Sequence, residues 1–132
     1  MRLPVVCAAL VVFAVGSATS PKPQTREAKR TGTFSNLRYI PEAGDLLGEE
    51  VRIVYTRSGW QGTVQLAEGV PYELIVVACE FKGDSLTFAI DHGEDQGVFR
   101  GVVGSRDLRG IMSFGPGAQE HWVLPRKKSY WE

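Results

Sequence analysis

Hydrophobic and polar residues alternate with a period of two from Gly32 to the end of the chain, and turn-forming residues interrupt the alternation about every 8 to 12 positions. The segment 50–56 is the clearest case, because Val51, Ile53 and Tyr55 fall on one face and Arg52 on the other. No segment of this region has the periodicity of a helix. The pattern therefore predicts an all-β domain of about eight antiparallel strands, mostly joined as hairpins.

The expected strands are separated by short turn sequences rich in Gly, Pro, Asp and Ser. We expect them over residues 33–39, 50–56, 60–66, 72–81, 86–90, 98–103, 108–114 and 120–124. The run 72–81 is the most apolar, so we expect it to form the most buried strand.

Three of the expected strands share a pattern of large apolar residue, polar residue and glycine, which places Gly62, Gly101 and Gly110 in mid-strand. A glycine there lets the strand bend or lets another side chain lie across it, as closing a small barrel requires. Together with the short sequential connections, this pattern favours an up-and-down meander in a closed or nearly closed barrel over a two-sheet sandwich.

The first 18 residues have the anatomy of a secretory signal peptide: one positive charge, an uninterrupted apolar run and small residues at Gly16 and Ala18. The apolar run is shorter than the ~20 residues that cross a bilayer, so we expect cleavage after Ala18 rather than an uncleaved anchor. Residues 19–31 lack apolar periodicity and are interpreted as a disordered basic linker before a single domain at 32–132. The expected location is secreted or periplasmic, with no membrane-spanning segment after cleavage.

The balance of charges and the number of cysteines exclude some kinds of partner and a disulfide. The chain has 15 Lys and Arg against 15 Asp and Glu, so no net charge favours nucleic acid or an anionic membrane. Cys7 belongs to the predicted signal, which leaves Cys79 alone in the domain and excludes an intramolecular disulfide there. Cys79 lies in an apolar run, where a thiol usually acts as a small buried hydrophobe.

No segment has the pattern of a catalytic or metal site. The loop 91–97 combines carboxylates with His92, but its spacing does not match a calcium loop, so we interpret it as a solvated hairpin loop. There is no nucleophile elbow and no phosphate-binding loop. We therefore predict no metal, no cofactor and no catalytic residue; a small hydrolase or isomerase would require His92 or His121 to meet a carboxylate inside a cavity.

Aromatic residues supply the candidate binding sites. Five of them are candidates for lining an apolar ligand cavity, or else for filling the interior: Trp60, Phe81, Phe88, Phe99 and Phe114. Tyr130 and Trp131, in the cationic tail 126–132, form either a partner surface or a segment that folds back across the barrel end.

The opening Gly32-Thr33-Phe34, the glycine-punctuated strands and the closing segment 122–126 resemble the small lipocalin-like, calycin-type barrels found as secreted bacterial proteins of unknown role. The resemblance spans Gly32 to about Trp131, with Phe34 where lipocalins usually have Trp. It implies an up-and-down barrel and no particular catalytic or binding residue. We therefore predict a module that binds a small apolar ligand in the barrel, or a protein or glycan at its rim. The alternatives are a small barrel enzyme and a structural or inhibitory envelope protein.

Overall fold

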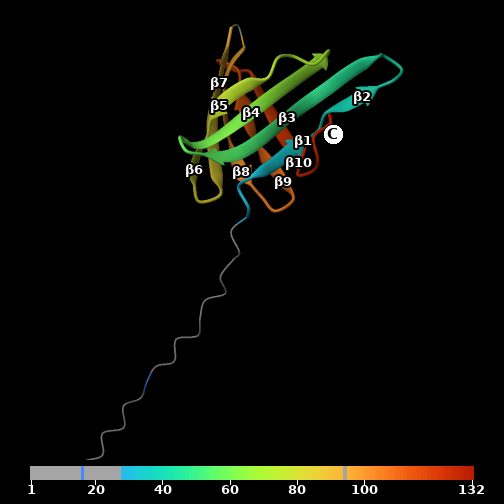
Figure 1. Cartoon of the computed structure of the whole chain (residues 1–132). Helices are drawn as coiled ribbons and strands as arrows, with labels where there is room; N and C mark the ends of the chain where they lie inside the picture. The colour runs from blue at the N-terminus through green and yellow to red at the C-terminus, as the bar shows by residue number, and fades with distance from the viewer. Residues whose placement is uncertain (1–15, 17–27, 94) are drawn as a thin grey trace, which may run out of the picture.

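A computed structural model of the chain describes residues 16, 28–93 and 95–132 (Figure 1). Within these residues there are strands and no helix, so the prediction of an all-β domain is confirmed. The strands are β1 (Gly32–Ser35), β2 (Arg38–Ile40), β3 (Asp45–Thr56), β4 (Gly59–Gly69), β5 (Ile75–Ala78), β6 (Glu80–Lys82), β7 (Ser85–His92), β8 (Asp95–Val103), β9 (Asp107–Ser113) and β10 (Gln119–Pro125).

The strands form two antiparallel sheets. In the first, the order is β1-β3-β4-β5, with β2 also paired to β3; in the second, it is β10-β9-β8-β7-β6. The long β3–β4 hairpin pairs Leu46 with Gly69 at one end and Thr56 with Gly59 at the other, and it dominates the first sheet in Figure 1. Its turn follows the sequence: Gly59 has a φ of 102°, and the Ser58 amide donates to Thr56 Oγ1 at 3.1 Å.

The apolar run 72–81 differs from its prediction in burial and in continuity. Val76 is 71% exposed and Leu74 is 64% exposed, so this segment is not the most buried strand. The reason is its position: β5 is the last strand of the first sheet, and the outward face of the strand has no layer above it. At Cys79, whose amide donates to the Trp60 carbonyl at 3.0 Å, the chain leaves β4 and continues as β6 beside β7.

This change of partner at Cys79 is one of two reasons why the structure has more strands than expected. One expected strand becomes β5 in the first sheet and β6 in the second, and the expected strand 33–39 is likewise divided into β1 and β2. The structure thus has ten strands in its described residues where about eight were expected.

At the opposite margins of the sheets, backbone contacts join the start of the domain to its end. Phe34 forms an isolated antiparallel bridge with Arg126, and the Lys127 amide donates to the Thr33 carbonyl at 3.1 Å. The two sheets are therefore connected on both sides, through β5 and β6 on one and through β1 and residues 126–127 on the other.

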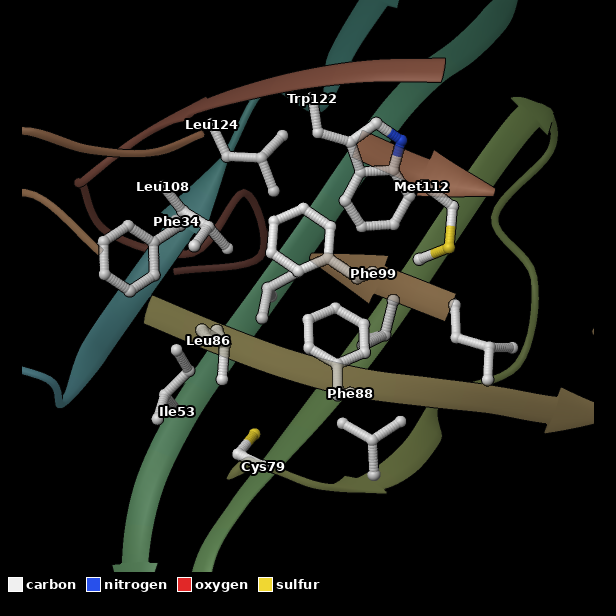
Figure 2. Close-up of a cluster of buried hydrophobic side chains, with 14 of the residues drawn as sticks. Phe34, Ile53, Cys79, Leu86, Phe88, Phe99, Leu108, Met112, Trp122 and Leu124 are labelled. Atoms are coloured by element: carbon white, nitrogen blue, oxygen red, sulfur yellow. The ribbon is translucent and has the colours of Figure 1, made fainter. Parts of the chain in front are cut away.

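The core lies between the inner faces of the two sheets, and aromatic rings fill its centre (Figure 2). Phe88 stacks on Phe99 with ring centroids 4.8 Å apart, and Phe99 lies 5.6 Å from Trp122. Gly101 and Gly110 are paired across β8 and β9, and a Cβ at either would lie 2.6 Å from Cζ of Phe99. The Phe99 ring therefore lies across two of the three mid-strand glycines.

The predicted signal peptide lies outside the described residues, except for Gly16, as does most of the predicted linker. The end of that linker, residues 28–31, is described and contacts the domain through Arg30 and through carbonyls that Arg126 binds. In the part of the chain that the structure describes, no helix is long and apolar enough to cross a membrane.

Candidate functional site

The five cavity candidates occupy two kinds of position. Phe88 and Phe99 are almost fully buried at the centre of the core, next to Trp122. Trp60, Phe81 and Phe114 are partly buried and pack against the core cluster. The structure brings Trp60 and Phe81 together, with centroids 5.2 Å apart. Side chains therefore occupy the central positions at which an apolar ligand was considered.

The C-terminal tail folds back onto the outer face of the first sheet. Glu50 of β3, only 9% exposed, accepts hydrogen bonds from Ser129 Oγ at 2.5 Å and from the Tyr130 amide at 2.9 Å. Hydrogen bonds to an ionised carboxylate are stronger than those between neutral groups. These bonds hold the tail in place, although chain termini are usually poorly ordered.

Gln65 of β4 fixes the last aromatic residue. Its Oε1 accepts from the Trp131 indole N–H at 2.8 Å, and its Nε2 donates to the Tyr72 carbonyl at 2.9 Å. Trp131 is nevertheless 57% exposed, and Tyr130 packs edge-on against it at 5.0 Å.

The neighbouring strand extends this region. Val76 of β5 lies directly opposite Thr63, two residues before Gln65 on the same face of β4. We call the group of Gln65, Val76, Tyr130 and Trp131 the outer-face patch. It combines exposed apolar and aromatic surface with side chains that hydrogen bonds hold in position.

Three carboxylates lie near one another at one end of the space between the sheets: Glu49 of β3, Glu68 of β4 and Glu120 of β10. Burial is the main cause that raises the pKa of Glu49, and the charges of Glu120 and Glu68 raise it further. The hydrogen bond to Asn36 and the charge of Arg38 act in the opposite direction and lower it. Glu120 also accepts from the Trp122 indole at 3.3 Å. Among the described residues, no three His, Cys, Asp or Glu side chains are arranged to hold a metal ion.

The inward position of a glutamate was not predicted, although the sequence indicates it. Glu49 and Glu50 are neighbours inside β3, and neighbouring residues of a strand point to opposite faces. One of the two glutamates therefore had to face inward and the other outward. Glu49 does the first, and Glu50 does the second and binds the tail.

Two cations close the other end of the interior. The guanidinium of Arg126 donates to the carbonyls of Thr31 at 2.7 Å, Lys29 at 2.5 Å and Gly104 at 3.0 Å, and its Cζ lies 4.5 Å from the centroid of the Phe34 ring. Burial lowers the pKa of Arg126. The second cation, Arg30, lies over Phe81 and Trp60.

Most of the predicted loop 91–97 forms the end of the β7–β8 hairpin. His92 pairs with Asp95 through the backbone, and Gln96 Nε2 donates to Asp91 Oδ1 at 3.2 Å. A shallow hollow of about 380 Å³ lies there, lined by parts of β7, β8 and β9 and by Gly115. His121 is on β10, exposed and opposite Ile111.

Cys79 is buried, as the sequence predicts for a structural thiol. Its sulfur lies 3.3 Å from the point that a Cβ on Gly62 would occupy, so the glycine makes room for it. Burial raises the pKa of the thiol to about 11, which keeps it protonated and unreactive near neutral pH.

Comparison with known proteins gives no relative from which a role could be transferred: no family model, no curated protein and no solved structure matches this chain.

Proposed function

We propose that the protein is a secreted or periplasmic binding module, a lipocalin-like closed barrel that engages a protein partner through the outer-face patch. The observation that carries the proposal is the state of Trp131, which is largely exposed and yet held by a hydrogen bond to Gln65. A large aromatic residue that is ordered before binding loses little conformational entropy in the complex, and Trp is enriched among the residues that dominate binding energy.

The packing of the interior favours an outer surface over an apolar ligand inside. Phe88, Phe99 and Trp122 contact one another at the centre, and all three are almost fully buried. A ligand there would have to displace these side chains, whereas a partner on the outer-face patch finds Val76 and Trp131 already exposed.

The lipocalin-like part of the proposal has support in the contact between the two segments that carry the resemblance. Phe34 of the opening segment pairs with Arg126 of the closing segment, and the guanidinium lies over its ring. The continuity of β5 and β6 joins the sheets at their other margins, as closure of a barrel requires.

The chemistry of the patch defines the partner. Trp131 and Val76 provide apolar contacts, and the exposed Lys127 and Lys128 precede Trp131 in the tail. We therefore expect a protein segment with apolar side chains at its centre and acidic side chains at its edge.

Site-specific photocrosslinking tests this proposal. A photoreactive benzoylphenylalanine replaces Val76 in the full chain, which is expressed in the cells that make it, and the matched control replaces Val102, an equally apolar exposed residue on β8. We expect a crosslinked protein from position 76 that is absent from position 102 and is lost when Trp131→Ala is added. An adduct shared by both positions, an adduct unaffected by Trp131→Ala, or capture of lipid or glycan in place of protein would refute the proposal.

A further inference from the structure

Three aromatic side chains form a continuous cluster at the end of the interior opposite the carboxylates. Tyr55 at the end of β3 packs edge-on against Trp60 at 4.9 Å, and Trp60 packs edge-on against Phe81 of β6 at 5.2 Å. Trp60 and Phe81 pack against the core on their inner side. Their positions are therefore set by the fold and not by what lies outside them.

Arg30 occupies the space beside these rings. Its Cζ lies 4.8 Å from the centroid of the Phe81 ring and 5.6 Å from that of Trp60, both within the range of a cation–π interaction. Its Nη2 donates to the Gly83 carbonyl at 2.7 Å, in the turn between β6 and β7. Two aromatic faces and one carbonyl acceptor thus surround one guanidinium.

This arrangement suits arginine better than lysine. A guanidinium is planar, stacks on aromatic rings and keeps several donors in a fixed plane, so it can contact both rings and still reach the Gly83 carbonyl. An ammonium is a strongly hydrated point charge, so it loses more hydration when it enters such a site.

The backbone beside Arg30 is held independently of its side chain. The carbonyls of Lys29 and Thr31, on either side of Arg30, both accept hydrogen bonds from Arg126. The side chain of Arg30 can therefore leave the rings without release of the segment, and its removal by mutation leaves the site open.

We propose that Trp60, Phe81 and the Gly83 carbonyl form a recognition site for an arginine side chain of a protein ligand, which Arg30 occupies within the chain until such a ligand displaces it. The site shares no residue with the outer-face patch, so the two proposals can fail separately. Because Arg30 is tethered next to the rings, its effective concentration is high, and it competes strongly with any arginine in solution.

Titration with N-acetyl-arginine-N-methylamide tests the proposal on the full chain. The readout is the Trp60 indole N–H resonance, assigned by its loss in Trp60→Leu. We expect Arg30→Ala to show a saturable shift. The wild type and Lys29→Ala, a control that removes a neighbouring cation, should bind at least tenfold more weakly because Arg30 still fills the site. The corresponding lysine amide should bind Arg30→Ala at least tenfold more weakly than the arginine amide does.

The result that overturns the proposal is absence of a saturable shift in Arg30→Ala, or equal shifts with the arginine and lysine amides, or equal affinity in the wild type and the variant. Arg30→Gln, which is neutral and closer in length, is the second open-site variant if Arg30→Ala does not fold. Failure of both variants to fold would make Arg30 a structural residue and would also overturn the proposal.

Discussion

A methyl group at position 110 should destabilise the domain because three atoms already occupy the space that it would take. A Cβ on Gly110 would lie 2.6 Å from Cζ of Phe99 and 2.6 Å from the Gly101 Cα, and it would come closer still to the Arg100 carbonyl oxygen. Two of these atoms belong to the backbone of β8, in the part that pairs with β9 from Val98 to Val103, so they cannot shift alone. Relief therefore requires that the strands separate or that the Phe99 ring leave its stacked position on Phe88.

Overpacking of this kind costs about 1–3 kcal/mol. Unfolding entropy of about 2 cal/mol/K per residue gives roughly 0.2 kcal/mol/K for a domain of this size, so Gly110→Ala should lower Tm by about 5–15 °C. The assay is thermal unfolding followed by circular dichroism. Gly104→Ala is the matched control, because the nearest atom to its Cβ is the Asp107 carbonyl oxygen at 3.2 Å and its backbone is not in the left-handed region.

A double-mutant cycle with Phe99→Leu separates the two sources of strain. The shorter side chain removes the contact at Cζ but not the backbone contacts, so we expect Gly110→Ala to cost less in the Phe99→Leu background, by about 0.5 kcal/mol or more. A Gly110→Ala protein that melts within about 2 °C of the wild type would refute the reasoning, as would a cost that does not change between the two backgrounds.

Three further predictions concern the glutamates and the cysteine. Glu50→Ala should release the tail, because it removes both acceptors that bind Ser129 and Tyr130. Carboxypeptidase should then remove residues 129–132, which stay protected in the wild type, and mass spectrometry measures the loss. Equal protection in both proteins would contradict this role of Glu50. The folded state raises the pKa of Glu49 above its ordinary value of 4.5, so the native protein holds this proton more tightly than the unfolded chain and loses stability as pH rises from 4.5 through the raised pKa. Glu49→Gln should therefore become more stable relative to the wild type across that window, as measured by urea unfolding at a series of pH values, and a stability difference that is independent of pH would contradict the assignment. Cys79, with a pKa of about 11, has only about a thousandth of its thiol ionised at pH 8 and should react with Ellman's reagent only after unfolding; fast reaction of the native protein would show an exposed thiolate.

The sequence predicts burial well where burial follows the local alternation of apolar and polar residues. It fails where the burial of a strand depends on what packs against that strand. Val51 and Ile53 alternate with the exposed Arg52 and Val54 as expected, because this part of β3 is covered on its inner face only. The run 72–81 is the most apolar of the domain, yet Val76 is exposed, because β5 lies at the end of a sheet and the outward-facing side chains of the strand have no layer above them. Position within a sheet depends on contacts far along the chain, so the local pattern does not encode it.

The candidate site was predictable in its residue types but not in its contacts. Tyr130 and Trp131 were expected to mark either a partner surface or a segment that folds back across the barrel end; the tail folds back instead onto the outer face of the first sheet. That outcome depends on Glu50 and Gln65, two polar residues on neighbouring strands whose role appears only when the tail is placed beside them. Arg30 was likewise predicted to belong to a disordered linker, because the rings that it contacts, Trp60 and Phe81, come from strands far along the chain.

The positions of Arg30 and Trp131 have a common explanation. Aromatic and aliphatic side chains pack the interior of this domain, and the mid-strand glycines Gly101 and Gly110 leave just enough room for the Phe99 ring. The strands of such a domain keep its core packed, so residues that bind partners are found more often on segments outside the strands. The two segments that flank the strands are held to the domain by hydrogen bonds of Arg126 and of Glu50, respectively. Each segment therefore carries an ordered side chain to a proposed site: Trp131 is part of the outer-face patch, and Arg30 occupies the site that Trp60, Phe81 and the Gly83 carbonyl form.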